Sequence, residues 1–422
     1  MNTWKKVLSI GAVALATVSL AACAGGSSSS KSGDSKILTV GYWKGSDTEN
    51  ATFDKLVKQF EKDNDVKIEA KVYTDMPTQL PTDLAGGTAP DVFYIDSSFY
   101  PYLQGQGVLA DLSDVIKSDD FYPTLADAFS TDGKIYAAPK DVSTLALYAN
   151  KDIFSKAGLN IADVPTSYED FIKWAPEAQT KIDAAYGAGQ VYLMNVNADL
   201  ARNWPYVVAE GQEPIAEDGT VQLTKSPTIA KNLGTLLDLF NTGAVATPQQ
   251  VGAGDEGAGF GTGKFALALT GNWNYKVFQE QYEGLNYEII PNMTFLGEKS
   301  TMQFTVGWGQ YKDAKNKEAA DKWIQYVSGK DGMTTWTEGV GTLATRPDVA
   351  ENSTFLADNP MLQVHQDAIE YAIAWQDGTS LSVLQASYGN FMSEPFKKGG
   401  TAEQLKAALK QVEDDANSKI SK

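Results

Sequence analysis

The chain has 422 residues, 43% of them apolar and 21% charged, which is typical of a soluble globular protein and enough for two domains. Its formal net charge of −18 disfavours binding to nucleic acid or to anionic lipid surfaces. One histidine, His365, and one cysteine, Cys23, exclude metal sites rich in these residues, and we expect no cofactor. The only arginines are Arg202 and Arg346. Because arginine is preferred for recognising carboxylate and phosphate groups, an uncharged polar ligand is favoured.

Residues 1–22 are predicted to form a signal peptide. Lys5 and Lys6 precede an apolar run that is too short to span a membrane and that ends in Leu20-Ala21-Ala22. These residues with Cys23 resemble a bacterial lipobox, and an incidental cysteine beside a cleavage site is the alternative. Residues 23–36 would then be a lipidated Cys23 followed by a Gly/Ser tether. We expect a protein on the extracellular face of the cell membrane, held by lipid alone, and the composition suits a Gram-positive surface.

The first part of the mature chain alternates predicted strands and helices. The strands are expected at 37–43, 66–72 and 91–96, and Ser46 or Asp47 is expected to cap the first helix. This order favours a mostly parallel sheet, with the ligand beyond the carboxyl ends of the strands. Trp43, Asp96 and Ser97 follow such strand ends, so we expect them at the ligand site.

The stretch 132–150 is predicted to carry the chain from one lobe to another. It opens with the turn dipeptide Asp-Gly and continues as two short strands, KIYAAP and STLALYAN. Pro139 and the polar pair Lys140-Asp141 separate the two strands, and Asp141 is a candidate ligand contact. Asn150 can cap the helix that follows.

The next part of the chain is predicted to be a second α/β unit. Thr166 and Glu169 have the spacing of a capping box. Asn197 and Asp199 follow the strand YLMN and are suited to hydrogen-bonding hydroxyl groups. The glycine-rich stretch 252–263 lacks the order of a phosphate-binding loop, so we expect a flexible loop there. The strand after it ends close to Trp273.

Two further stretches are predicted to carry the chain from one lobe to the other. Gly307 and Gly309 flank Trp308 in a strand at 304–311, which leaves room for the ring or lets the backbone change direction. The stretch 339–347 is the third expected crossing, and Trp375 is expected in a loop of the helical C-terminal part.

Taken together, these stretches resemble the family 1 extracellular solute-binding proteins of bacterial ABC importers, in the group around the maltose-binding protein. The matching segments are APDVFYIDSS, DGKIYAAPKDVSTLALYANKDIF, VPTSYEDF, GKFALALTGNWNY and NKEAADKWIQYVSGKDG. The resemblance implies an α/β periplasmic-binding-protein fold of type II, with each lobe a mostly parallel sheet flanked by helices and three interlobe crossings. It places the N-terminal lobe at 37–142 plus 308–342 and the C-terminal lobe at 143–307 plus 343–422.

The resemblance also implies individual site residues. Trp273 stands where the family has a sugar-stacking tryptophan. Asp96 and Ser97 fall on the ligand loop of the first lobe, Asp199 on an acidic contact of the second lobe, and Tyr388 near a further aromatic contact. A departure is Ser143, which replaces a ligand-binding glutamate of the maltose-binding protein and weighs against maltose.

The aromatic residues independently favour a carbohydrate ligand. Sugar rings pack their C–H faces on aromatic rings while acids and amides bond their hydroxyl groups, as in small-ligand pockets generally. Trp43, Trp273, Trp308 and Trp375 are therefore candidate ligand contacts. Aromatic residues lie more often in a hydrophobic core than in a ligand site, and we assign Trp174, Trp323 and Trp336 to the core. Sequence alone does not decide whether Trp204 and Arg346 contact the ligand.

The predicted mechanism is capture of the sugar by hinge closure, followed by docking of the monomeric closed form on the permease of an ABC importer. We expect no chemistry on the sugar, so the protein is not predicted to be an enzyme. A lipid-anchored glycoside hydrolase is one rival, because two of the 53 acids could flank a bond. A surface adhesin or sensor is the other, although no repeats are visible.

Overall fold

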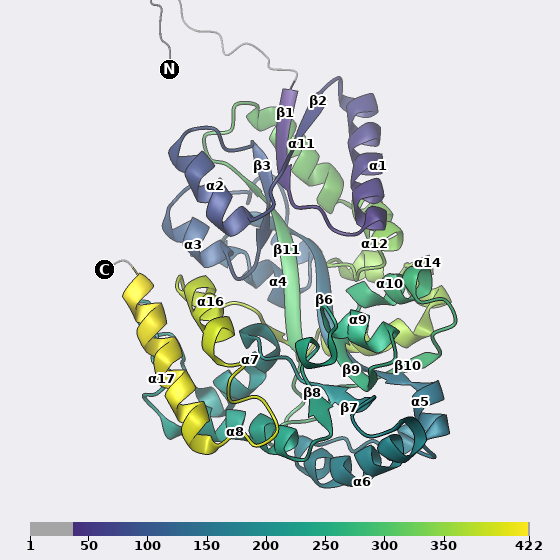
Figure 1. The fold of residues 1–422 in the computed structure, drawn as a ribbon. Coiled ribbons are helices and arrows are strands. Elements are labelled where there is room, and N and C mark those ends of the chain that lie inside the picture. The colour runs from purple at the N-terminus through teal and green to yellow at the C-terminus, as the bar shows by residue number, and fades with distance from the viewer. Residues whose placement is uncertain (1–36, 421–422) are drawn as a thin grey trace, which may run out of the picture. The chain divides into compact units, whose positions relative to one another are not determined.

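The computed structural model of the protein describes residues 37–420. The predicted signal peptide, the lipid attachment at Cys23 and the tether lie outside these residues. Figure 1 shows the arrangement of the strands and helices. The strands are β1 (Ile37–Tyr42), β2 (Lys67–Val72), β3 (Val92–Asp96), β4 (Ser130–Thr131), β5 (Lys134–Ile135), β6 (Ala137–Asn150), β7 (Tyr192–Asn195), β8 (Val245–Ala246), β9 (Phe265–Gly271), β10 (Tyr287–Ile290), β11 (Met302–Gln310) and β12 (Ile373–Ala374). The α-helices are α1 (Asp47–Asn64), α2 (Met76–Ala85), α3 (Tyr100–Gly105), α4 (Pro123–Asp127), α5 (Lys151–Lys156), α6 (Tyr168–Tyr186), α7 (Leu200–Val208), α8 (Pro227–Asn241), α9 (Glu256–Gly261), α10 (Trp273–Gln281), α11 (Lys317–Ser328), α12 (Lys330–Val340), α13 (Pro347–Ala350), α14 (Thr354–Asp358), α15 (Gln363–Ala368), α16 (Leu381–Phe391) and α17 (Ala402–Lys419).

The main sheet has the strand order β2-β1-β3-β11-β6-β9-β7-β8. The pairs at its two ends are parallel, as the alternating strands and helices predict. The pairs in its centre, which involve β11 and β6, are antiparallel. The sheet is therefore mixed, and β6 and β11 lie side by side through the middle of the fold (Figure 1).

Strand β6 runs through the point where the sequence predicts a break. It is continuous over 14 residues, so the expectation of two short strands is wrong. Its register with β11 shifts, because Pro139 lies opposite Gly307 while Asp141 lies opposite Val306. Lys140 is thus the extra residue of a β-bulge, an irregularity that bends a strand and re-aims side chains. Proline cannot donate a hydrogen bond to the ladder and is therefore usually absent from central strands. It is tolerated beside a bulge, where the ladder is interrupted.

Two hydrophobic cores lie along the sheet. The first-lobe core contains buried side chains between Leu38 and Ala138 and between Trp308 and Val349. The second-lobe core contains buried side chains between Leu145 and Met302 and between Trp375 and Ala416.

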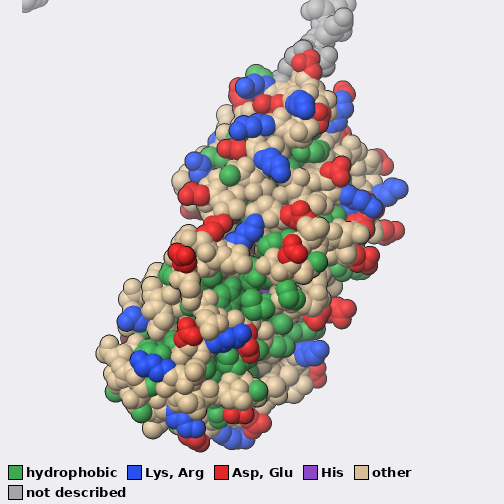
Figure 2. Space-filling view, turned by 90° about the vertical axis from the view of Figure 1, so that its right-hand side faces the viewer, with side chains coloured by type: hydrophobic (Ala, Val, Ile, Leu, Met, Phe, Trp, Pro, Cys, Tyr) green, Lys and Arg blue, Asp and Glu red, His purple; other side chains and the backbone are tan. Residues whose placement is uncertain are grey.

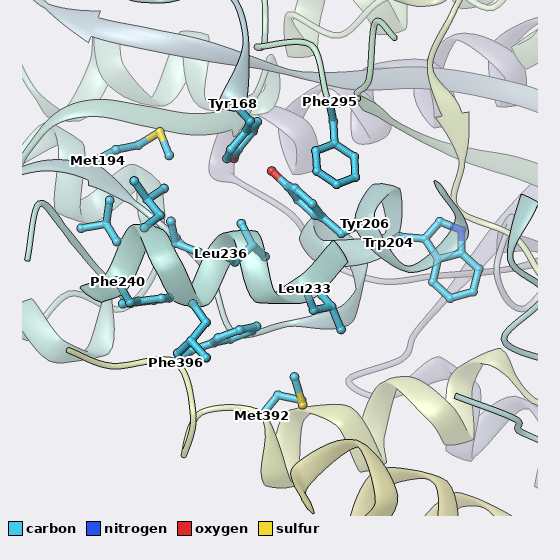
Figure 3. Packing of buried hydrophobic residues seen from close by; sticks show 14 of the residues in the cluster. Tyr168, Met194, Trp204, Tyr206, Leu233, Leu236, Phe240, Phe295, Met392 and Phe396 are labelled. Atoms are coloured by element: carbon cyan, nitrogen blue, oxygen red, sulfur yellow. The ribbon is translucent and has the colours of Figure 1, made fainter. Parts of the chain in front are cut away.

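Figure 3 shows part of the second-lobe core, where the Tyr206 ring lies between those of Tyr168 and Phe295 with centroid distances of 5.3 and 4.6 Å. A smaller cluster, which includes Tyr148, Tyr275 and Phe278, joins β6, β9, β10 and α10. Helix α10 therefore belongs to the second lobe, whereas α1 and α12 pack on the first.

Helix caps follow the predicted chemistry at most positions. Ser46 caps α1 by accepting a hydrogen bond from the Glu49 amide, and Asn150 caps α5. The capping box expected at Thr166 is wrong by one residue, because Ser167 caps α6. The carbonyl of Thr166 instead accepts a hydrogen bond from the Thr294 amide.

The expectation of a flexible loop at 252–263 needs correction, because the stretch contains α9. Asp255 caps this short helix, and Glu256 is its buried first residue. A Cβ atom at Gly257 would lie 2.5 Å from the Asn274 side chain, so this glycine permits close packing of α9 against α10.

Within residues 37–420, no helix has the length and apolar character needed to cross a membrane. The same part of the chain contains no group of three or more His, Cys, Asp or Glu side chains placed to hold a metal ion.

Candidate functional site

An interlobe pocket of about 380 Å³ lies where the two lobes meet. The first lobe contributes the end of β1, the start of α1 and the end of α12, while the second contributes α10, and β6 and β11 lie between them. Its lining residues are Trp43, Ser46, Glu49, Lys140, Asp141, Ser143, Trp273, Lys276, Val277, Glu280, Phe304, Val306, Val340 and Thr342. Figure 2 views the side of the molecule that carries α1, α10 and α12, where hydrophobic side chains gather in the middle and lower parts among scattered charged ones.

Aromatic side chains from both lobes line the interlobe pocket. Trp43 follows β1 and contacts Tyr94 edge-on, with ring centroids 5.0 Å apart. Trp273 is the first residue of α10, and its ring meets Phe304 of β11 edge-on at 5.9 Å. All three lining rings are half-buried, so each keeps surface that a ligand can contact. A Cβ atom at Gly271 would lie 2.0 Å from the Trp273 ring, so this glycine lets the ring fold back over the end of β9.

The β-bulge in β6 places a buried ion pair at the base of the interlobe pocket. The Lys140 side chain is 4% exposed, and its ammonium lies 2.6 Å from the Asp141 carboxylate. The ammonium also lies 3.9 Å from the centre of the Trp336 ring, a favourable cation–π geometry. The Trp336 indole donates a 2.7 Å hydrogen bond to the same carboxylate. Both charges are therefore compensated, and Asp141 keeps one oxygen free of these two contacts.

Glu49 is a carboxylate of the interlobe pocket that the sequence analysis missed. It lies in the first turn of α1, half-buried. Burial raises the pKa of its carboxyl group, the Lys140 ammonium lowers it and the Asp141 carboxylate raises it, so the net shift is upward. The Ser46-x-x-Glu49 spacing of a helix start was visible in the sequence, but its proximity to the bulge in β6 was not.

Behind Trp273 lies a charged network in the second lobe. The Arg202 guanidinium is 5.7 Å from the centre of the Trp273 ring and donates a 2.8 Å hydrogen bond to Glu256. Burial lowers the pKa of Arg202, but the Asp199 and Glu256 carboxylates raise it by more. Burial raises the pKa of Glu256, and the neighbouring Arg202 lowers it below its ordinary value. This network fixes the back of the Trp273 ring, a role that nothing in the sequence around Arg202 indicates.

Two predicted site residues, Asn197 and Asp199, lie in a second hollow and not in the interlobe pocket. This β7–β8 pocket of about 560 Å³ is lined mostly by polar residues and lies beyond the carboxyl ends of those strands. Asp199 caps α7 by accepting the Arg202 amide, and the Asn197 side chain donates to Glu256 at 3.0 Å. Both side chains therefore join the network behind Trp273.

Asp96 and Ser97 lie at the end of β3, as predicted, but outside the residues that line the interlobe pocket. The Ser97 hydroxyl donates to the Trp375 carbonyl at 3.1 Å, and Gln376 donates to the Ser97 carbonyl at 3.0 Å. Burial raises the pKa of Asp96, although hydrogen bonds from Ser98 oppose that shift. This loop therefore joins the two lobes in the structure.

The remaining predicted contacts have buried side chains. Trp308 is 0% exposed and packs against Tyr94 and Trp323 in the first-lobe core, because β11 is covered on both faces. Trp375 packs edge-on against Trp204 at 5.4 Å in the second-lobe core.

Tyr388 is buried, and its hydroxyl accepts a 3.1 Å hydrogen bond from Asn203. Of the ten predicted ligand contacts, only Trp43, Asp141 and Trp273 line the interlobe pocket.

Trp204 and Arg346, whose roles the sequence does not decide, contact other residues of the fold and do not line the interlobe pocket. Trp204 lies in the second-lobe core. Arg346 bonds Asp120 at 3.1 Å and Asp348 at 3.0 Å, away from the interlobe pocket. Trp323 and Trp336 are buried, as predicted, and Trp174 packs half-buried against the second-lobe core.

A mixed sheet with helices on both sides, two cores and a pocket between them define a two-lobed binding protein of the periplasmic type. The model of the bacterial extracellular solute-binding protein family matches residues 55–363, and the chain belongs to this family. The chain is therefore identified with a family of extracellular proteins that bind solutes, as the sequence motifs predict.

Known relatives extend over most of the chain. The maltodextrin-binding protein of Bacillus subtilis is 27% identical over 352 residues, which cover 77% of this chain and 76% of the relative. A maltooligosaccharide ABC transporter solute-binding lipoprotein of Streptococcus pneumoniae is 26% identical over 339 residues, with 76% of each chain covered.

Solved structures share the fold. An ABC substrate-binding protein from Listeria monocytogenes in complex with cycloalternan superposes with a TM-score of 0.76 at 22% identity, covering 90% of this chain and 98% of the other. The GacH receptor of Streptomyces glaucescens, described unliganded and with acarbose, gives a TM-score of 0.74 at 24% identity, covering 91% and 99%. These similarities confirm the predicted two-lobed fold.

Proposed function

We propose that this protein captures an oligosaccharide in the interlobe pocket by hinge closure and delivers it to the permease of an ABC importer. The observation that carries the proposal is the pairing of Trp43 and Trp273, from opposite lobes, around a pocket lined by carboxylates and hydroxyl groups. Aromatic faces suit the C–H surfaces of a sugar ring, and the polar groups suit its hydroxyls. The relatives named for maltodextrin and maltooligosaccharide support a sugar as the ligand.

An uncharged ligand is further supported by the charged groups of the interlobe pocket. Lys140 is bound to Asp141, and Lys276 donates to two backbone carbonyls at 2.8 and 2.6 Å. Neither ammonium is therefore available to compensate the charge of an anionic ligand. Arg202, whose guanidinium lies 5.7 Å from the centre of the Trp273 ring, is engaged with Glu256.

The proposed lobes are residues 37–142 plus 308–342 and residues 143–307 plus 343–422. The positions of the two cores support this division, although buried side chains of the first-lobe core continue to Val349. Asp96, Asn197 and Asp199 remain proposed contacts for the ends of a longer sugar. Ser97, Trp308, Trp375 and Tyr388 are not part of the proposal, because their side chains are buried.

The proposed location is the extracellular face of the cell membrane, with a lipid on Cys23 as the anchor and the protein acting as a monomer. The family and the lipoprotein relative of Streptococcus pneumoniae support this location. Metabolic labelling with a fatty-acid analogue tests the anchor, since Cys23→Ser is expected to abolish the label and release the protein from the membrane.

The bound sugar is proposed to leave unchanged. A glycosidase needs one carboxylic acid and one carboxylate flanking the scissile bond. Of the three carboxylates that line the interlobe pocket, Asp141 is bonded to Lys140 and Trp336, and Glu280 accepts a hydrogen bond from Thr48. Only Glu49 remains, and one group does not make the required pair. Chromatography of an oligosaccharide after prolonged incubation should recover it intact, whereas shorter products would establish the hydrolase alternative.

The experiment that tests the proposed function is thermal unfolding of the full chain with a panel of mono- and oligosaccharides, amino acids, peptides and metal ions. A ligand that binds only the folded state at 100 times its Kd adds about 2.7 kcal/mol to the free energy of unfolding. We expect a raised Tm with one class of oligosaccharide alone. Stabilisation by peptides or metals, with none by sugars, would refute the proposal.

A further inference from the structure

We infer that Lys276 is a positioning residue that holds the lobes closed, and that α10 couples sugar contact at Trp273 to closure through this lysine. The inference rests on the proposed capture of a sugar in the interlobe pocket. It concerns a lysine that lines the pocket and whose ammonium binds backbone carbonyls of the other lobe.

The contact joins elements that pack on different cores. The Lys276 ammonium of α10 donates to the carbonyls of Glu338 and Gly339, at 2.8 and 2.6 Å. These carbonyls belong to the last turn of α12, which packs on the first-lobe core, whereas α10 packs on the second-lobe side of β6. Figure 1 shows α10 next to the end of α12.

The chemistry at the end of α12 favours a cation. The last carbonyls of a helix have no partner within the helix and carry the negative end of its dipole. Here the cation comes from the other lobe and satisfies two of these carbonyls together. Burial lowers the pKa of Lys276, while Glu280 and Glu338 raise it, and the net shift is downward. The ammonium is therefore partly withdrawn from water and depends on its partners on α12.

Glycines shape the receiving surface. Gly341 ends α12 in the left-handed region with φ of 81°, and a Cβ atom there would lie 2.9 Å from Cγ of Lys276. The Lys276 stem thus occupies the space that a side chain at 341 would fill. Gly339 similarly permits close packing on Thr52 of α1.

A second contact lies one turn further along the same helix. Glu280 accepts hydrogen bonds from the Thr48 hydroxyl of α1 at 3.0 and 3.1 Å. Trp273, Lys276 and Glu280 have the i, i+3, i+7 spacing of one helix face. That face carries the proposed sugar contact at its first residue and the interlobe contacts beyond it. A sugar that orders the start of α10 therefore also orders the groups that close the lobes, which shifts the population toward the closed state.

The test compares Lys276→Met, which keeps the length of the stem but removes the charge, with Lys276→Arg, which restores a cationic donor. Spin labels on the exposed positions 58 and 180, in a Cys23→Ser background, report the distance between the lobes. We expect Lys276→Met to lengthen this distance without added sugar and to raise the dissociation rate of the bound oligosaccharide about 10-fold, which is within the usual range for coupled sites. Lys276→Arg should restore both readouts.

Three controls separate the possible outcomes. Trp273→Ala should abolish sugar binding while leaving the sugar-free distance unchanged. Thr48→Val, which removes only the exposed contact, should give a smaller effect of the same sign. Unchanged distances and dissociation rates in Lys276→Met, with Tm retained, would overturn the inference. If the wild type binds no sugar but Lys276→Met still lengthens the distance, the proposed function fails and the role of Lys276 in closure stands.

Discussion

At the scale of single residues, burial separates the aromatic side chains that face the interlobe pocket from those that fill the cores. Trp43 and Trp273 follow strand ends, and their positions beside the pocket could be predicted from that pattern. Trp308 has a similar aromatic and glycine-rich context, but it lies in a strand covered on both faces. Alternation of side chains carries no information about exposure in such a strand. For this reason the sequence could not distinguish Trp308 from Trp273.

Polar contacts between residues far apart in the chain could not be predicted from the sequence either. Glu256 and Arg202 are 54 positions apart, and nothing local pairs them. Lys140 was recognised only as part of a polar pair, because its bulge is defined by the register with β11. The polar residues of the candidate site are therefore set by strand pairing, which local patterns do not specify.

His365 gives a prediction for the pH dependence of stability. It is buried, with Nδ1 3.1 Å from the Thr144 hydroxyl and Nε2 3.0 Å from the Tyr148 hydroxyl. Burial lowers its pKa from 6.5 to about 3, with the hydrogen bond at Thr144 opposing the shift. Between these pH values the unfolded chain binds a proton that the folded chain does not. Stability should therefore fall as the pH drops from 6.5 toward 3, by up to about 1.4 kcal/mol per pH unit from this residue.

Urea unfolding of the wild type and of His365→Gln between pH 7.5 and 4 measures this contribution. Glutamine can retain a hydrogen bond but does not titrate, so the variant should lose stability less steeply on acidification. The difference at pH 7.5 controls for the cost of the substitution itself. Parallel curves for the two proteins over this range would contradict the assignment.

At the scale of elements, helix starts were the most predictable features. Ser46 and Asn150 cap the helices expected of them, because a short polar side chain before an apolar periodic segment acts locally. The error of one residue at Thr166 arose because that backbone pairs with Thr294, far along the chain. The continuity of β6 through Pro139 was missed for the same reason, since the bulge requires a partner strand.

The junction between β9 and α10 gives a prediction about Trp273. In Gly271→Ala, the added methyl group would lie 2.0 Å from the Trp273 ring, so the ring must move. We expect sugar affinity to fall by about 10-fold or more, corresponding to about 1.4 kcal/mol, with a change in tryptophan fluorescence. Gly234→Ala is a matched control, because a Cβ atom there meets no atom within 4 Å in the interior of α8. That variant should retain affinity and gain up to about 1 kcal/mol of stability. Equal affinities of the two variants would refute the positioning of Trp273 by this glycine.

At the scale of the whole molecule, the alternation of strands and helices predicts an α/β fold, and the ordered motifs predict two lobes. The mixed centre of the sheet follows from the antiparallel pairing of β6 and β11, which pass between the cores. The proposed hinge closure would change the contacts that join the two lobes. The structure assigns two such interlobe contacts to α10 and others to the Ser97–Trp375 region.

The proposed sugar binds between the lobes against Trp273. Isothermal titration calorimetry with the oligosaccharide identified by thermal unfolding measures its affinity for the wild type, Trp273→Ala and Trp174→Ala. Trp174 is a half-buried tryptophan on α6, outside the interlobe pocket, and serves as the matched control. We predict that Trp273→Ala loses at least about 100-fold in affinity, a factor equivalent to about 2.7 kcal/mol, while Trp174→Ala binds like the wild type. Full affinity in Trp273→Ala would contradict this prediction.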